Sequence, residues 1–194
     1  MFWDKGDEQY SGDSSYRFVD KLIMADSRKL LVVSPYIGNS YAKLLISEAR
    51  RKKVYVVTSQ SSLEYENSVL KGIPEIGAMK RYLKPMAYFS VITAFAVYFN
   101  LSYFVYPLIA IVLVFVALTY LTYRKTRSNF LLKVSREKFV HEKLYINDRE
   151  AIVGSANLTF SGMHKNVEHI QMIRDMKKRD ALEDHFKKLW SSIG

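Results

Sequence analysis

Residues that can bind and cleave a phosphodiester gather between positions 141 and 157. His141 and Lys143 lie two residues apart, and the run Gly154-Ser155-Ala156-Asn157 follows them. An imidazole can act as a nucleophile or as a proton donor near neutral pH. The lysine ammonium and the asparagine amide donate hydrogen bonds to phosphate oxygens. These residue types therefore indicate phosphoryl chemistry.

Strand periodicity would place these side chains together. The sequence predicts a strand over Val140 to Ile146, on which alternate residues share a face, so His141 and Lys143 should point the same way. A second strand, Ala151 to Val153, is expected to end at the Gly-Ser pair. The turn there would direct Asn157 back toward the histidine.

The spacing of these residues resembles the HxKxxxxD and GSxN signature of the phospholipase D superfamily. The matching positions are His141, Lys143, Asp148, Gly154, Ser155 and Asn157. The interval between Asp148 and Gly154 is one residue shorter than is common in the family. The resemblance covers Tyr16 to Trp190 apart from an apolar insertion. It implies an α/β fold, with a mixed sheet flanked by helices, and an enzyme that needs neither a metal nor another cofactor.

The resemblance also implies a role for each matching residue. His141 is expected to attack phosphorus and form a phosphohistidine. Lys143 and Asn157 would hold the phosphate oxygens and offset their charge. Ser155 would add a hydrogen bond or hold the turn.

Three further residues receive supporting roles from the same resemblance. Glu168 lies eleven residues after Asn157, where the family has a carboxylate that orients the catalytic histidine. Asp148 and Gly154 are expected to be structural. Of the other histidines, His164 and His185 are expected on the surface, and His169 should point away from the site.

The chain contains one copy of the motif, whereas the family site uses two that face each other. One histidine attacks phosphorus while another protonates the leaving oxygen, so a single copy lacks an acid partner. The sequence therefore predicts a homodimer with twofold symmetry and a site at its interface.

A long uncharged run interrupts the resemblance. The chain has 194 residues, no cysteine and a net charge of +10. No charged residue or histidine occurs over the 38 residues from Met86 to Tyr123. One membrane crossing takes about 20 apolar residues, so the run fits two crossings joined near Asn100-Leu101-Ser102. Two alternatives are a buried hairpin of a soluble protein and a single crossing over Tyr103 to Tyr123.

Basic residues flank the uncharged run on both sides. Lys80, Arg81 and Lys84 precede it, and Arg124, Lys125 and Arg127 follow it. This pattern predicts a two-pass membrane protein with both ends of the hairpin, and the catalytic domain, on the cytoplasmic side. The predicted organisation is residues 1–84 and 124–194 as the two parts of a phospholipase D-like domain, with a transmembrane hairpin at 85–123 inserted between them.

The remaining segments predict an alternation of helices and strands. The expected helices are Tyr16–Ala25, Asn39–Arg51, Ser61–Lys84 with an interruption at Gly72-Ile73-Pro74, and Asp180–Ser192; the expected strands are Lys29–Pro35, Lys53–Thr58, Phe130–Val134 and Val167–Arg174. The strand–helix–strand order at Lys29 to Thr58 predicts a parallel pair.

The favoured interpretation is a membrane-anchored phosphodiesterase that acts on a phospholipid, because the excess positive charge lies beside the apolar run. A nuclease that acts on DNA or RNA is the alternative, and Lys133, Arg136 and Lys138 could serve it. A non-catalytic membrane scaffold is a third possibility. The sequence does not distinguish between phospholipid headgroups.

Overall fold

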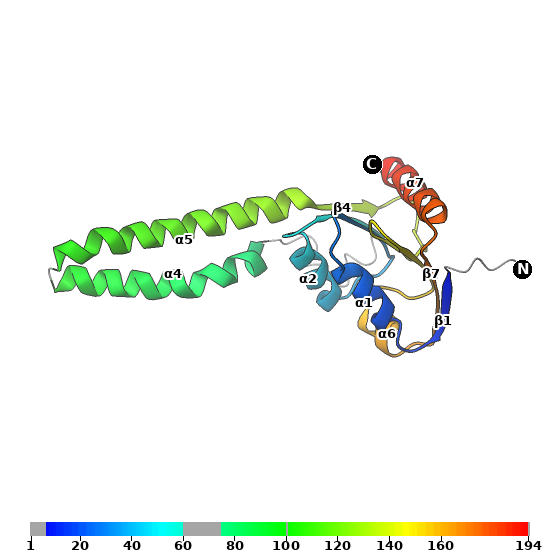
Figure 1. Ribbon diagram of the computed structural model, residues 1–194, viewed down its shortest axis with the longest axis horizontal. Coiled ribbons are helices and arrows are strands. Elements are labelled where there is room, and N and C mark those ends of the chain that lie inside the picture. Colours follow the sequence, from blue (N-terminus) through cyan, green and yellow to red (C-terminus); the bar gives the residue numbers. More distant parts are fainter. Residues whose placement is uncertain (1–6, 60–74, 100, 194) are drawn as a thin grey trace, which may run out of the picture. The chain divides into compact units, whose positions relative to one another are not determined.

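A computed structural model describes residues 7–59, 75–99 and 101–193 of the chain (Figure 1). The chain forms two compact units, one of residues 1–73 and 129–194 and the other of residues 74–128. The elements are β1 (Glu8–Gly12), α1 (Tyr16–Met24), β2 (Lys29–Val33), α2 (Asn39–Glu48), β3 (Lys53–Ser59), α4 (Glu75–Tyr98), α5 (Ser102–Asn129), β4 (Phe130–Ser135), β5 (Leu144–Ile146), β6 (Ala151–Gly154), α6 (Phe160–His164), β7 (Glu168–Ile173) and α7 (Met176–Ser192).

The first unit is built on a mixed seven-stranded sheet with the order β1-β7-β6-β5-β2-β3-β4. Strands β2, β3 and β4 run parallel, which confirms the predicted parallel pair at Lys29 to Thr58. Strand β5 runs antiparallel to β2, and β6, β7 and β1 continue with antiparallel pairing. The sheet is therefore mixed, as the sequence predicts.

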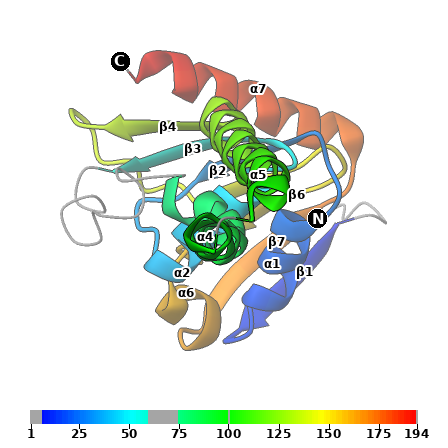
Figure 2. The same cartoon turned by 90° about the vertical axis from the view of Figure 1, so that its left-hand side faces the viewer.

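Alternate residues of the central strands supply two separate cores. Leu30 and Val32 of β2 belong to the core under α1 and α2, whereas Leu31 and Val33 belong to the core under α7. Figure 2 shows α7 on one face of the sheet and α1 and α2 on the other. Because both faces are covered, the central strands are apolar throughout rather than alternating with polar residues.

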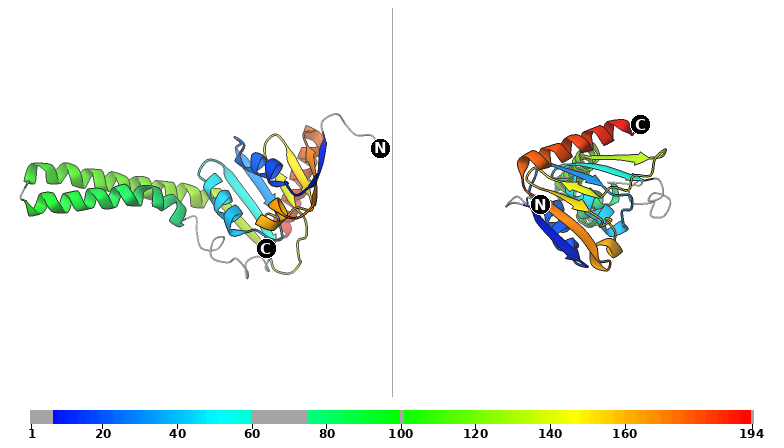
Figure 3. Two further views of the ribbon diagram at one scale, coloured as in Figure 1. Left: turned by 90° about the horizontal axis from the view of Figure 1, so that it is seen from below. Right: turned by 90° about the vertical axis from the view of Figure 1, so that its right-hand side faces the viewer.

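Several elements differ from the sequence-based expectation. Strand β1 and the short helix α6 were not predicted; β1 is polar and pairs with β7 at the edge of the sheet (Figure 3). Helix α7 begins at Met176 rather than at Asp180, because the Asp175 side chain caps its first turn by accepting from the Lys178 amide. Strand β5 begins at Leu144, so the strand predicted to start at Val140 is wrong over its first half.

The second unit consists of α4 and α5. Helix α4 continues through Pro85, and the part of the predicted helix Ser61–Lys84 that precedes Glu75 lies outside the described residues. Within the described residues, Tyr103–Asn129 is the one helix long and apolar enough to cross a membrane; the apolar part of α4, Leu83–Tyr98, is shorter. The predicted pair of crossings is therefore not confirmed.

The threonine hydroxyls on α4 and α5 donate to carbonyls of their own helices. Thr93 donates to the Phe89 carbonyl at 2.7 Å, and Thr119 donates to the Phe115 carbonyl at 2.7 Å. The rings of Phe89 and Phe115 stack at 5.7 Å between centroids, so the two helices pack on each other. A hydroxyl that bonds to the carbonyl four residues earlier needs no water, which suits an apolar environment.

The turn between β5 and β6 depends on Asn147, which is 1% exposed. Its Oδ1 accepts from the amides of Arg149 at 2.8 Å and Glu150 at 2.9 Å, and its Nδ2 donates to the Leu22 carbonyl at 3.2 Å. Asp148 accepts from the Arg28 amide at 2.6 Å and so fixes the residue before β2. Asn147, the residue before Asp148, therefore closes the shortened turn.

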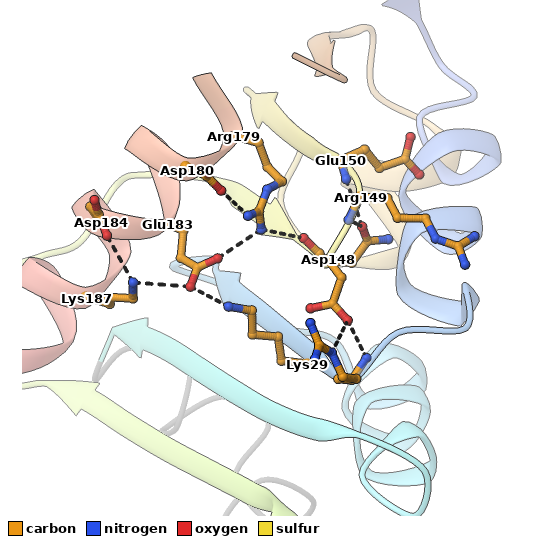
Figure 4. Close-up of polar contacts among 11 residues, drawn as sticks. Lys29, Asp148, Arg149, Glu150, Arg179, Asp180, Glu183, Asp184 and Lys187 are labelled. Atoms are coloured by element: carbon orange, nitrogen blue, oxygen red, sulfur yellow. Dashed lines mark hydrogen bonds and ion pairs between the residues drawn. The ribbon is translucent and has the colours of Figure 1, made fainter. Parts of the chain in front are cut away.

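Charged residues of α7 join this turn to the sheet (Figure 4). Arg179 donates to the Asn147 carbonyl at 3.1 Å and to Glu183 at 2.9 Å. Glu183 also accepts from Lys29 of β2 and forms an ion pair with Lys187 at 3.3 Å. Each buried charge in this group therefore has an opposite charge beside it, as burial requires.

Replacing Asn147 with alanine should destabilise the globular unit more than replacing Asp148. Asn147→Ala leaves two amides and one carbonyl without their partner, which should lower the free energy of unfolding by about 2–4 kcal/mol. Asp148→Ala removes an accessible acceptor and should cost about 1 kcal/mol. Urea unfolding of both variants measures the difference. Equal losses would show that Asn147 does not determine the turn.

Candidate active site

Apart from Asp148, the motif residues singled out by the sequence lie at one end of the strands of the sheet. Lys143 directly precedes β5, Gly154 ends β6, and Glu168 begins β7. Leu144 pairs with Val153, so the start of β5 lies beside the end of β6. We call this end of the strands, where β2 ends and β5 begins, the site edge. Asp148 lies at the opposite end of β5, away from the other motif residues.

His141 and Lys143 are in direct contact. The Lys143 Nζ lies 3.2 Å from Nε2 and 3.4 Å from Nδ1 of His141, and it donates to the His141 carbonyl at 2.8 Å. The histidine side chain is exposed, whereas Lys143 is 5% exposed. Both residues precede β5, so the alternation of side chains along a strand does not explain their contact.

Burial changes the electrostatics of the ammonium. Removal from water lowers the pKa of Lys143, and the negative charge of Glu168 partly opposes this effect. A poorly hydrated cation binds an anion more strongly than a fully hydrated one does. The Lys143 ammonium is therefore suited to hold phosphate oxygens beside the exposed imidazole.

Ser155 and Glu168 are paired across the ends of β6 and β7. The Ser155 hydroxyl donates to Glu168 and accepts from the His169 amide at 3.0 Å. Glu168 also accepts from Asn166 Nδ2 at 3.2 Å. Within the described part of this chain, Glu168 has these partners and does not hydrogen-bond His141. The predicted bond that orients the histidine is therefore absent within one chain, since Ser155 occupies the carboxylate.

The loop that follows Ser155 is tied to the sheet and to the loop after β2. The Tyr145 hydroxyl, buried in β5, donates to the Ala156 carbonyl at 2.8 Å. The Leu158 amide donates to the Ser34 hydroxyl at 3.0 Å, and the Leu158 carbonyl accepts from the Gly38 amide at 2.8 Å. These anchors fix the backbone on both sides of Asn157.

Asn157 has a buried amide oxygen without a hydrogen-bond partner among the described residues. An unpaired buried polar atom is costly and is usually retained for a reason. The backbone here is crowded, because a Cβ on Gly162 would lie 2.5 Å from the Asn157 carbonyl oxygen. A Cβ on Gly154 would lie 2.2 Å from the His169 carbonyl oxygen. Both glycines therefore permit close packing of the loop.

Two exposed aromatic residues beside His141 were missed by the sequence reasoning. The Phe139 ring lies 6.0 Å from the His141 ring, and the Tyr36 ring lies 5.9 Å from that of Phe139. Phe139 is 53% exposed and Tyr36 is 41% exposed. Phe139 lies two residues before His141 in the sequence, whereas the approach of Tyr36, in the loop after β2, could be inferred only once the strand order was known.

The remaining histidines are placed elsewhere. His169 points to β1, where its Nδ1 lies 2.7 Å from the Ser11 hydroxyl. His185 is exposed, as expected. His164 is half-buried and stacks on Tyr16 at 4.4 Å between ring centroids, so it is less exposed than a free surface residue. Among the described residues, no three His, Asp or Glu side chains converge as a metal site would require.

A family model described as the PLD-like domain of cardiolipin synthase matches residues 19–190. The chain belongs to the phospholipase D superfamily. Members of this superfamily act as phosphodiesterases or transferases. The match spans both parts of the sheet and the helices α4 and α5 that separate them in the sequence. A comparison with curated proteins found no match.

Solved structures have a similar fold. Nuc from Salmonella typhimurium, described as a phospholipase D family member, is 16% identical over 97% of both chains, with a TM-score of 0.57. NucT from Helicobacter pylori is 13% identical over 96% of both chains, with a TM-score of 0.56. The archaeal chromatin protein TrmBL2, described as having a novel mode of DNA binding, is 13% identical over 55% of its own chain, with a TM-score of 0.54.

Lys143→Met should make the protein more stable at neutral pH. The folded state lowers the pKa of Lys143, so keeping the buried ammonium charged in the folded state costs stability. Methionine keeps the chain length without the charge. The advantage of the variant should shrink as pH rises toward the ordinary lysine pKa, where the penalty is lost. Urea unfolding at several pH values measures this, and a variant less stable at neutral pH would contradict it.

Proposed function

We propose that this chain is a membrane-anchored phosphodiesterase that cleaves a phospholipid through a phosphohistidine intermediate. The observation that carries the proposal is the buried Lys143 ammonium, 3.2 Å from the exposed His141 ring at the site edge. The GSxN loop lies at the same edge. This arrangement supports a site in which a nucleophile and a cation meet the same phosphate.

The mechanism has two steps. A ring nitrogen of His141 forms a bond to phosphorus while the bond to the leaving alcohol breaks, and His141 of the second copy gives its proton to that alcohol. The second histidine then takes a proton from water, whose oxygen attacks phosphorus and breaks the P–N bond. Lys143 and the Asn157 amide offset the charge on the phosphate oxygens in both steps.

A homodimer supplies what one chain lacks. One chain brings a single histidine to the site edge, and Glu168 is engaged with Ser155 rather than with that histidine. A twofold axis through the site edge would bring a second His141, Lys143 and Asn157 to the same phosphate. The dimer therefore places the nucleophile and the proton donor on different copies.

The anchor and the favoured substrate follow from α4 and α5. The run Met86–Tyr123 carries no charge, and many of its large apolar side chains are exposed, including Val91, Phe95 and Leu113 at 62–67%. So large an apolar surface needs lipid or protein to cover it. We propose that both helices cross the membrane, with the globular unit on the cytoplasmic side. A site tethered to a bilayer meets phospholipids at high local concentration.

Nucleic acid is the second candidate substrate. Arg136, Lys138 and Phe139 are exposed in the loop that leads to His141. Cations that bind phosphates and aromatic rings that stack on bases are the two features of single-strand binding. If nucleic acid is the substrate, its binding to the protein should weaken strongly as the salt concentration rises.

Turnover by the full chain, purified in detergent and reconstituted, tests the proposal. Mixed phospholipid vesicles, single-stranded DNA and RNA are offered separately with chelator present. We expect lipid cleavage, which His141→Ala should reduce at least about a thousandfold, because it removes the nucleophile. His185→Ala, which alters another exposed histidine, should retain activity. Cleavage of nucleic acid alone would favour the second candidate, and no turnover would reject both.

Mixed dimers test whether two histidines share one site. When wild-type chains and His141→Ala chains assemble at random, only dimers with two wild-type copies contain both histidines. Activity should therefore fall as the square of the wild-type fraction, to about a quarter when half of the chains are wild type. Coexpression with two affinity tags gives dimers of known composition. A linear fall would mean that each chain works alone.

A further inference from the structure

The loop between β4 and β5 carries two cations that the proposed chemistry does not use. Arg136 and Lys138 are exposed, and within the described residues neither forms an ion pair. Lys138 lies three residues before His141. Three residues of extended chain span about 10 Å, so the Lys138 backbone lies within that distance of the nucleophile. A group held by these cations would therefore lie close to the phosphate at the site edge.

Both side chains line a cavity of about 540 Å³ between this loop and the end of α7. Val140 and the α7 residues Leu189 and Ser192 form part of its wall. Val140 is buried and directly precedes His141. The cavity is large enough for a phosphate group and its ester, and Val140 of its lining is next to His141 in the sequence.

The surroundings of the cavity are fixed and suit an anion. Lys133 of β4 donates to the carbonyls of Trp190 at 2.9 Å and Ile193 at 2.6 Å at the end of α7. These bonds offset the negative end of the helix dipole, which would otherwise repel an anion. Ser135 donates to the Lys138 carbonyl and closes the loop.

The charge of the cavity lining is positive. Arg136 and Lys138 each contribute one positive charge, and Glu137 contributes the one opposing carboxylate of the lining. An arginine beside a lysine provides several donors for the oxygens of one phosphate.

We propose that Arg136 and Lys138 bind a second phosphate group of the substrate, adjacent to the phosphodiester that His141 attacks. This inference rests on the proposed function, because it assigns a neighbour to the same scissile phosphate. The second phosphate has the same chemistry whether it belongs to the next nucleotide of a nucleic acid or to a lipid with two phosphates.

The test compares probes that differ by one phosphate. One pair is thymidylyl-thymidine with and without a 5′-phosphate. The other pair is cardiolipin and phosphatidylglycerol, each in phosphatidylcholine vesicles of equal total negative charge. For each pair we take the ratio of two kcat/KM values, that of the two-phosphate probe divided by that of the one-phosphate probe. The double variant Arg136→Gln with Lys138→Gln should lower this ratio about tenfold. The pair that shows the effect identifies the source of the second phosphate.

Two further variants control for charge. Lys53→Gln with Lys177→Gln removes two exposed positive charges elsewhere on the globular unit and should leave the ratio unchanged. Glu137→Gln removes the opposing carboxylate and should raise the ratio about two- to threefold, as expected for one exposed charge. An unchanged ratio in the Arg136 and Lys138 variant, or an equal fall in the control, would overturn the proposal.

Binding separates failure of this inference from failure of the proposed function. Calorimetry on His141→Ala measures affinity for the same probes without turnover. A preference for a two-phosphate probe that Arg136→Gln with Lys138→Gln abolishes would support the subsite, even if the wild type cleaves none of the probes. If no such preference exists, the subsite is wrong, whatever the enzyme cleaves.

Discussion

The three-residue strand β5 is the constraint on which the candidate site depends. It lies between β2 and β6 and runs antiparallel to both, so its two ends meet opposite edges of the sheet. Lys143 precedes the strand at the site edge, and Asp148 follows it at the other edge. The spacing between Lys143 and Asp148 is thus the number of residues needed to run once along β5 from one end of the strands to the other. A one-residue slip would move Leu144 and Ile146 out of the core under α7 and Tyr145 out of the core under α1 and α2.

The site combines a rigid backbone with polar groups that are costly to bury. Tyr145 in β5 and Ser34 after β2 hold the GSxN loop, and the Asn157 amide oxygen is buried there without a hydrogen-bond partner among the described residues. The Lys143 ammonium is also buried, and its pKa is lowered as a result. Both features oppose folding. A bound phosphate would offset the Lys143 charge, whereas the Asn157 oxygen is an acceptor and needs a donor group. Such local conflicts with stability are typical of functional sites.

The sequence predicted the elements whose signal is local. Strands β2 and β3 and helix α1 agree closely with prediction, because continuous apolar runs and helical spacing define them. Strand β1 could not be predicted, since its polar residues gain order only by pairing with β7. The contact between Ser155 and Glu168, and that between Tyr36 and Phe139, likewise depend on strand order. The motif predicted which residues gather at the site edge, but not their individual hydrogen bonds.

The central claim is that His141 attacks phosphorus. Quenching the reaction during turnover and digesting the protein under alkaline conditions would preserve a phosphorus–nitrogen bond for mass spectrometry. Attack by His141 should leave a covalent adduct on the peptide that contains this residue, with the mass of the group left after the alcohol departs. Rapid turnover without an adduct, or an adduct confined to a peptide that lacks His141, would contradict it.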